Sequence, residues 1–182
     1  MLESYRKALS DLDQAGRLRA LAPRRGYDFS SNDYLALAES PELAQAVADA
    51  LRRGVPVGAG GSRLLRGNHH EHEILEDEAA RFFGAEAAMY FGGGFPANTA
   101  LFATLPQSDD LILYDELIHA SVHDGLRISR AASQSIAHNN VQAFEDALRA
   151  HRGRGRCWIA VESLYSMDGD VAPLKELVEV AN

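Results

Sequence analysis

Apolar positions follow two different periods along this sequence, and their alternation predicts its elements from residue 70 onward. Apolar residues spaced three or four positions apart favour helices, whereas short apolar runs between polar or glycine-rich turns favour strands. These patterns predict helices at 70–83, 98–105, 118–128, 141–150 and 174–180, and strands at 87–91, 111–114, 133–137 and 158–162. Strands that alternate with helices at these lengths indicate an α/β fold, in which helices cover the faces of a sheet.

The first 69 residues give fewer elements. Residues 4–21 have helical spacing, and a short strand is predicted at 27–29. A second helix is predicted at 42–53, where Ser40 can cap it and Pro41 suits its first turn. We therefore expect an N-terminal helical segment ahead of the α/β part.

Composition and charge narrow the class of protein. The chain has 182 residues, which suits one domain or most of one. A formal net charge of -8 argues against a nucleic-acid-binding protein, which typically has a basic excess. No apolar run approaches the ~20 residues that span a bilayer, and the first residues lack the apolar core of a signal peptide. The single cysteine, Cys157, excludes a disulfide within the chain, so we expect a cytoplasmic protein.

Polar residues gather where the predicted strands end. In α/β sheets the ligand lies beyond the carboxyl ends of the strands, so the residues directly after each strand are the candidates. These are the glycine turn at 92–94, then Asp115, Glu116, His119 and Ser121, and finally Glu162, Ser163, Ser166, Asp168 and Asp170. The set combines a glycine turn, an imidazole, carboxylates and hydroxyls on one rim of the sheet.

The glycine turn has the sequence FGGGFPAN, beginning at Phe91. Between a strand and a helix, such a turn exposes backbone N–H groups and directs the positive end of the helix dipole at one point. Both features favour a bound phosphate. A tight connection without a ligand is the alternative that the turn alone leaves open.

Six sequence blocks, in order, resemble those of the α-oxoamine synthases, which are pyridoxal-5'-phosphate (PLP) enzymes of aminotransferase fold type I. The blocks are DFSSNDYL from Asp28, GAGGSR from Gly58 with GNH and HEILE after it, the glycine turn from Phe91, DELIHAS from Asp115, HNN from His138 and ESLYSMDGD from Glu162. Within the family, the chain is most similar to the 8-amino-7-oxononanoate synthases of biotin synthesis. The resemblance implies part of the PLP-binding large domain at 41–182, preceded by a helical, substrate-side segment at 1–40.

The resemblance also implies roles for individual residues at the cofactor. Main-chain N–H groups at Gly93, Gly94 and Phe95 would hold the cofactor phosphate, because glycine permits close approach. His119, the residue assigned a catalytic role, would stack on the pyridine ring, and Ser166 would hydrogen-bond the phenolic oxygen.

Three further residues are assigned by resemblance to the substrates. Glu162 would lie beside the substrate, Asn32 would face the site, and Arg19 would bind the carboxylate of the acyl substrate with its bidentate fork. The implied reaction is a decarboxylative condensation of L-alanine with a pimeloyl thioester of coenzyme A or acyl carrier protein, in a homodimer. The serine palmitoyltransferase, 5-aminolevulinate synthase and glycine C-acetyltransferase types remain alternatives, because the sequence does not specify the acyl chain.

One departure from the family concerns lysine. The Schiff-base lysine of the family, with the Asp and His that contact the pyridine ring, belongs to a region that would follow Asn182. The lysines of this sequence are Lys7 and Lys175, and neither corresponds to that position. We therefore expect this polypeptide alone to be inactive, either as a truncated copy of the enzyme or as a non-catalytic, lysine-less partner subunit.

No metal site is predicted. His69 and His72 lie three residues apart on a helical turn, but a third ligand at a suitable spacing is lacking, so His72 is interpreted as a packed residue. The DGD sequence at 168–170 lacks the glutamate that closes a calcium loop and is interpreted as a turn. His138 is interpreted as a structural residue or as one that supports the residues in contact with the ligand.

Overall fold

The computed structural model describes residues 2–21, 23, 25–153 and 155–182. The backbone forms two compact units, residues 1–68 and residues 69–182, and each unit is described by itself. The boundary predicted at residue 40 separates a substrate-side segment from a cofactor domain. That division is a functional one, and it stays a prediction.

The described part of the first unit contains α1 (Glu3–Gln14), α2 (Pro41–Arg52) and the π-helical turn η1 (Arg63–Gly67). Ser40 caps α2, as predicted, because its Oγ accepts a hydrogen bond of 3.3 Å from the Leu43 N–H. Such a cap satisfies one of the N–H groups that a helix leaves unbonded in its first turn.

Two predictions for the first unit are wrong. The helix predicted at 4–21 ends at Gln14, and Gly16 then adopts a left-handed conformation with a φ of 65°, which turns the chain out of the helix. The strand predicted at 27–29 does not form, and Phe29 is 97% exposed. A strand this short is stable only beside a neighbour, and no strand pairs with it in the described part of the unit.

The second unit is built on a parallel sheet in the order β2–β1–β3. The strands are β1 (Leu111–Asp115), β2 (Ala132–Ile136) and β3 (Cys157–Ala160). The helices described in this unit are α3 (His70–Phe83), α4 (Gly94–Thr104), α5 (Ala120–Ile128), α6 (Val141–Ala150) and α7 (Leu174–Ala181). Over the described residues of the whole chain, no helix has the length and apolar character needed to cross a membrane.

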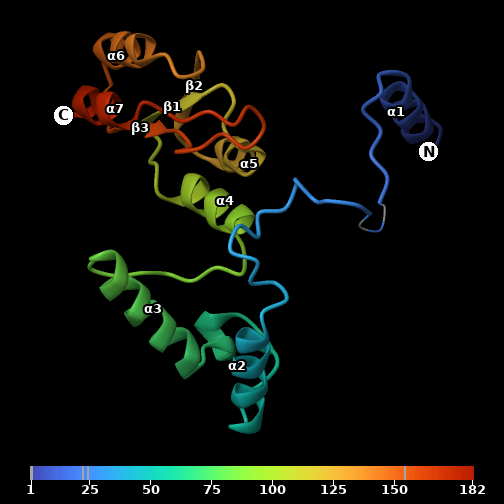
Figure 1. Cartoon of the computed structure of the whole chain (residues 1–182). Coiled ribbons are helices and arrows are strands. Elements are labelled where there is room, and N and C mark those ends of the chain that lie inside the picture. Colours follow the sequence, from blue (N-terminus) through green and yellow to red (C-terminus); the bar gives the residue numbers. More distant parts are fainter. Residues whose placement is uncertain (1, 22, 24, 154) are drawn as a thin grey trace. The chain divides into compact units, whose positions relative to one another are not determined.

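Successive residues of β1 point to opposite faces of the sheet and build two cores. Ile112 packs with Val122 of α5, and Leu113 packs with Phe144 of α6 and Leu177 of α7. Figure 1 shows α6 and α7 on one side of the sheet and α5 on the other. The predicted α/β fold with helix-covered faces is therefore confirmed.

The prediction of a strand at 87–91 is wrong, because the backbone of this apolar run forms no regular secondary structure. A strand exists only with hydrogen-bonded neighbours, and the described residues offer this segment none. The Tyr90 N–H donates instead to Glu76 Oε1 of α3, at 2.8 Å. Met89 is 74% exposed, and the segment lines an open groove of about 430 Å³ with α3 and α4.

Helices α4 and α5 pack closely because residue 125 is glycine. A Cβ at Gly125 would lie only 2.8 Å from Phe102 Cβ and 3.1 Å from the carbonyl oxygen of Thr99. Glycine therefore allows a closer approach than any other residue would. This contact places the beginning of α4 beside α5, and both helices carry predicted site residues.

Candidate functional site

The glycine turn leads directly into α4. The helix begins at Gly94, rather than at residue 98 as predicted, and Gly93 precedes it without a side-chain cap. Pro96 lies in the first turn and has no N–H, so Gly94 and Phe95 supply the donors at this helix end. Apart from the neighbouring residues and the backbone of its own helix, no described heavy atom lies within 4 Å of the position that a Cβ would take at Gly94. A ligand can therefore approach this backbone closely.

His119 caps α5 and is oriented by α4. Its Nδ1 accepts a hydrogen bond of 3.1 Å from the Ser121 N–H and lies 2.7 Å from Ser121 Oγ, so the helix starts at Ala120. Two side chains of α4 fix Ser121 in turn. Asn98 Nδ2 donates to its Oγ at 3.0 Å, and Thr99 Oγ1 donates to its carbonyl oxygen at 3.1 Å.

Phe95 connects the two helix ends. Its ring lies edge-on to the His119 ring, with 6.1 Å between the centroids and an interplanar angle of 78°. The His119 side chain is exposed, so the imidazole can receive a flat ligand. Gly93, Gly94, Phe95 and His119, which were predicted to bind one cofactor, therefore meet at one end of the α4–α5 pair.

The segment after β3 folds back on itself as a loop at 163–171. The Tyr165 N–H donates to the Asp170 carbonyl oxygen at 2.9 Å, and the Gly169 N–H donates to the Tyr165 carbonyl oxygen at 2.8 Å. Gly169 has a φ of 75°, and a turn forms here as predicted, with its turn residues at 166–168. Tyr165 is buried and Ser166 is exposed, so the loop is anchored by one residue and presents the next.

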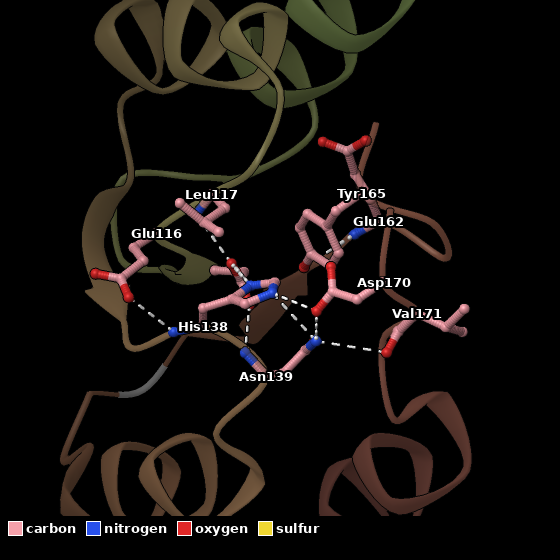
Figure 2. Close-up of polar contacts among 9 residues, drawn as sticks. Glu116, Leu117, His138, Asn139, Glu162, Tyr165, Asp170 and Val171 are labelled. Atoms are coloured by element: carbon pink, nitrogen blue, oxygen red, sulfur yellow. Dashed lines mark hydrogen bonds and ion pairs between the residues drawn. The ribbon is translucent and has the colours of Figure 1, made fainter. Parts of the chain in front are cut away.

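His138 connects the end of β1 to this loop (Figure 2). Its Nδ1 lies 2.8 Å from Asp115 Oδ1, and its Nε2 lies 2.8 Å from Asp170 Oδ2. Asn139 bridges the same pair, since its N–H donates to Asp115 Oδ2 and its Nδ2 donates to Asp170 Oδ2, both at 2.8 Å. The Tyr165 ring lies edge-on to the His138 ring, with 4.5 Å between centroids.

The charges of this group favour an imidazolium between two carboxylates. Burial raises the pKa of the Asp115 carboxyl, but hydrogen bonds from the Asn139 N–H, the His138 ring and the Leu117 N–H outweigh it, so the pKa is lowered. The hydrogen bonds that the His138 ring makes with Asp115 and with Asp170 raise the pKa of His138. Burial raises the pKa of Tyr165 to about 12, so its hydroxyl is neutral at physiological pH.

The other predicted site residues are less directly connected. Glu162 and Ser166 lie on the segment after β3, and among the described residues no hydrogen bond or ring contact joins either of them to His119. Arg19 and Asn32 lie in the first unit, where both are exposed. Their contribution to a common site stays a prediction.

The histidines that suggested a metal site have other partners. The His69 side chain accepts a hydrogen bond of 3.3 Å from the Glu71 N–H, and His72 Nδ1 accepts one of 3.2 Å from the His69 N–H. Together they cap α3, and the His72 ring stacks on Tyr90 with 6.2 Å between centroids. In the part of the chain that the structure describes, no group of three or more His, Cys, Asp and Glu is placed to hold a metal ion.

Two sets of contacts were not predicted from the sequence. The bonds from Asn98 and Thr99 to Ser121 join two helices and leave no local signal. The bridge through His138 did have a signal, because Asp115 ends one strand and His138 follows the next. Carboxyl ends of neighbouring parallel strands meet at one edge, so their contact could have been predicted.

The sequence matches the family described as aminotransferase class I and II over residues 24–182. It is 40% identical over 194 residues to an 8-amino-7-oxononanoate synthase of Emericella nidulans, which covers 99% of this chain and 47% of the relative. It is 43% identical over 148 residues to an enzyme of the same name from Geobacter sulfurreducens, covering 81% and 38%. The chain thus spans less than half the length of these relatives.

Solved structures give a consistent result. The chain is similar to the Sphingomonas wittichii serine palmitoyltransferase, with a TM-score of 0.87, 28% identity and coverage of 100% of this chain and 50% of that one. It is also similar to a variant S. paucimobilis serine palmitoyltransferase with a bound PLP–myriocin aldimine, with a TM-score of 0.85, 26% identity and coverage of 99% and 50%. The predicted resemblance and the fold-type-I architecture are therefore confirmed, and PLP is indicated as the cofactor.

Proposed function

Because this chain belongs to the aminotransferase class I and II family, we propose that it forms part of the PLP site of an acyltransferase of the 8-amino-7-oxononanoate synthase type. The names of its curated relatives and the PLP-bearing structural neighbour support the proposal. The observation that carries it is the meeting of the α4 N-terminus, at Gly94 and Phe95, with the imidazole of His119.

The N-terminus of α4 fits the cofactor phosphate. The N–H groups of Gly94 and Phe95 belong to the first turn, where a helix supplies no acceptor. The preceding residue, Gly93, has no side chain that could cap them. The open space at the Gly94 Cβ position gives an anion access to them. A phosphate there gains hydrogen bonds and the favourable end of the helix dipole.

The pyridine ring is assigned to His119 and its phenolic oxygen to Ser166. When bound, PLP supplies an electron sink for the α-carbon of the amino acid. The contribution of the chain is to bind and orient it. Ser121 fixes the His119 ring through Nδ1 before any ligand arrives, which lowers the entropic cost of ordering that ring on binding.

The proposed substrates are L-alanine and a pimeloyl thioester carried by coenzyme A or acyl carrier protein. Glu162 would lie beside the amino acid, Asn32 would face the site, and Arg19 would bind the distal carboxylate of the pimeloyl chain. Arg19 borders an open hollow of about 400 Å³ together with Arg17, and a guanidinium group suits a carboxylate ligand. We propose a cytoplasmic homodimer for the whole protein.

We propose that this polypeptide alone has no synthase activity, because neither of its lysines is assigned to the cofactor. Lys175 is exposed on α7, which packs on the opposite face of the sheet from α5 and His119. Lys7 is exposed on α1 of the first unit. A borohydride reduction of the chain mixed with PLP tests this point by mass spectrometry. We expect no specific adduct, and a stoichiometric adduct on one of the two lysines would contradict the assignment.

A serine palmitoyltransferase type is the second candidate, since the solved structures reported above carry that name. The two candidates differ at the distal end of the acyl chain, which is a carboxylate in one and a methyl group in the other. Binding of pimeloyl-CoA and palmitoyl-CoA to the chain separates them. The first candidate predicts that Arg19→Ala weakens the binding of pimeloyl-CoA but not that of palmitoyl-CoA. The second candidate predicts that Arg19→Ala changes the binding of neither.

Equilibrium dialysis of the chain against PLP and pyridoxal tests the PLP site itself. The two ligands share the pyridine ring, and only PLP carries the 5'-phosphate. We expect PLP to bind at least ~10-fold more tightly, because charge-assisted hydrogen bonds of this kind contribute about 1.5–3 kcal/mol each. Equal affinity for the two ligands would contradict a phosphate site at α4.

A further inference from the structure

Besides the buried Tyr165, two residues that follow β2 attach the loop at 163–171 to the rest of the second unit. Asn139 Nδ2 donates to Asp170 Oδ2 at 2.8 Å and reaches the Val171 carbonyl oxygen at 3.4 Å, while His138 Nε2 lies 2.8 Å from Asp170 Oδ2 (Figure 2). The edge-on contact with the buried Tyr165 ring adds a packing contact. The place of the loop therefore depends on residues 138 and 139.

These two residues are themselves fixed by Asp115. Its carboxylate is fully buried at the end of β1, and it accepts hydrogen bonds from the Asn139 N–H and from the Leu117 N–H, at 2.8 and 2.9 Å, besides its contact with His138 Nδ1. Asn139 has a φ of 52°, a left-handed conformation that is unfavourable for a residue with a side chain. The bonds from both its backbone and its side chain offset that cost.

We propose that His138 is a positioning residue: by bridging Asp115 and Asp170, it fixes the loop that carries Ser166 and thereby sets the affinity of the site for PLP. This inference rests on the proposed function, because Ser166 matters only if the loop contacts the cofactor. His138 would then change cofactor binding measurably although it does not contact the cofactor itself.

The bridge is complete only when the imidazole is protonated. Each ring nitrogen faces a carboxylate oxygen, and a carboxylate only accepts, so both nitrogens must carry a proton to donate. The neutral ring retains one donor and turns a lone pair toward the other carboxylate. Asp115 is fully buried, whereas the Asp170 side chain is 44% exposed and also receives a donor from Asn139. The bond to Asp170 is therefore the one that deprotonation breaks.

The neighbouring groups fix the direction of the pH effect. The charged groups that contact the His138 ring are Asp115 after β1 and Asp170 in the loop, whereas Glu116 accepts a hydrogen bond from the His138 backbone N–H; the Tyr165 hydroxyl stays neutral over this range. The two groups at the ring are carboxylates, so they favour its protonated form. Because the pKa of His138 is raised, the bridge is complete below the ordinary value of 6.5 and is lost as the pH rises through the raised value.

Nuclear magnetic resonance tests the bridge without any ligand. We expect the His138 ring of the full chain to titrate above pH 6.5. We expect His138→Gln and Asp170→Asn to lower the hydrogen-exchange protection of the Tyr165 and Gly169 amides by ~10-fold, since each change removes a charge-assisted hydrogen bond. Asp170→Asn keeps the side-chain shape and serves if His138→Gln fails to fold. Unchanged protection in a folded variant would overturn the proposal.

Dialysis with PLP between pH 6 and 9 then tests the positioning role. The ionisation of PLP changes both affinities by the same factor at each pH, so it cancels in the ratio of wild-type to variant affinity. We expect His138→Gln to bind ~10-fold more weakly at the acidic end and to approach the wild type at the alkaline end. The exposed His70 provides the control, and His70→Gln should match the wild type throughout.

The two hypotheses fail in different ways. If the wild-type chain binds no PLP at any pH, the proposed function fails. If it binds PLP but His138→Gln and Asp170→Asn follow the wild type at every pH, the positioning role is refuted while the PLP site stands.

Discussion

The side-chain amide of Asn98 in α4 donates a hydrogen bond of 3.0 Å to the hydroxyl of Ser121 in the first turn of α5, and so joins the two helices. The same hydroxyl lies 2.7 Å from Nδ1 of His119. One buried serine thus connects the helix that begins with the glycine turn to the imidazole beside it. The N-terminus of α4 and the His119 ring are therefore positioned by a common contact.

Removing the Ser121 hydroxyl should loosen both parts of the site. Ser121→Ala leaves the Asn98 amide and the His119 ring without this partner inside a close-packed helix pair. We expect a loss of ~1–3 kcal/mol of stability in urea unfolding and a several-fold weaker affinity for PLP. Ser133→Ala, an exposed serine on β2, is the matched control. Identical behaviour of the two variants would contradict the role given to Ser121.

Two substitutions at Gly94 distinguish the contribution of its N–H group from the contribution of its missing side chain. Proline fits this first helical position, and the extended backbone of Gly93, with a φ of 173° and a ψ of 159°, tolerates a following proline. Gly94→Pro removes one donor to the phosphate and should weaken PLP by ~10-fold or more. Gly94→Ala keeps the donor and should weaken PLP less. A Gly94→Pro protein with wild-type affinity would exclude this N–H from the site.

Asp110 should make the stability of the second unit depend on acidic pH. Hydrogen bonds from the Gln107 N–H, from the Trp158 ring at 2.9 Å and from the Arg156 N–H at 2.7 Å lower the pKa of its carboxyl. A lowered pKa gives stability that is present above the ordinary value of 3.8 and is lost as the pH falls through the lowered value. Urea unfolding should therefore show a larger difference between the wild type and Asp110→Asn at pH 7 than at pH 3. A difference that does not change with pH would contradict this account.

Ala36 adopts a backbone conformation that suits glycine better. Its φ is 52°, and its N–H donates to the Asp33 carbonyl oxygen at 3.1 Å in a turn. A left-handed conformation costs a residue with a Cβ about 1–2 kcal/mol. Glycine avoids this cost, but its greater conformational freedom in the unfolded chain cancels part of the gain in stability. Ala36→Gly should increase the exchange protection of the Leu37 and Ala38 amides, which donate to the Asp33 carboxylate. Decreased protection would show that the turn does not strain Ala36.

The sequence was sufficient where the signal is local. Ser40 caps α2 and Gly84 ends α3 with a φ of 64°, as sequence patterns of this kind predict. The apolar runs of β1, the central strand, and of β3, an edge strand, were recognised because side chains of both strands pack into the two cores. Their neighbours in the chain also supplied the polar rim, so Asp115, His119 and Ser166 could be named as candidates.

The sequence was insufficient where a partner decides. The runs at 27–29 and 87–91 have strand-like composition, but a strand requires a hydrogen-bonding neighbour that composition does not reveal. The early start of α4 was missed because its first three residues include Gly94 and Pro96, and glycine and proline are poor helix formers away from a helix end. The ends of two neighbouring strands indicate the contact of Asp115 with His138, but no sequence signal indicates that Asp170 joins them, so that part of the bridge is visible only in the fold.

The central claim is that the α4 N-terminus binds the phosphate of PLP beside His119. The most direct measurement is a titration of the ¹⁵N-labelled chain with PLP and with pyridoxal, followed through its amide resonances. We predict that PLP shifts the amides of Gly94 and Phe95 strongly, with smaller shifts around His119, and that pyridoxal leaves Gly94 and Phe95 unchanged. Shifts at Gly94 and Phe95 that are the same for both ligands, or PLP-dependent shifts confined to other parts of the chain, would contradict it.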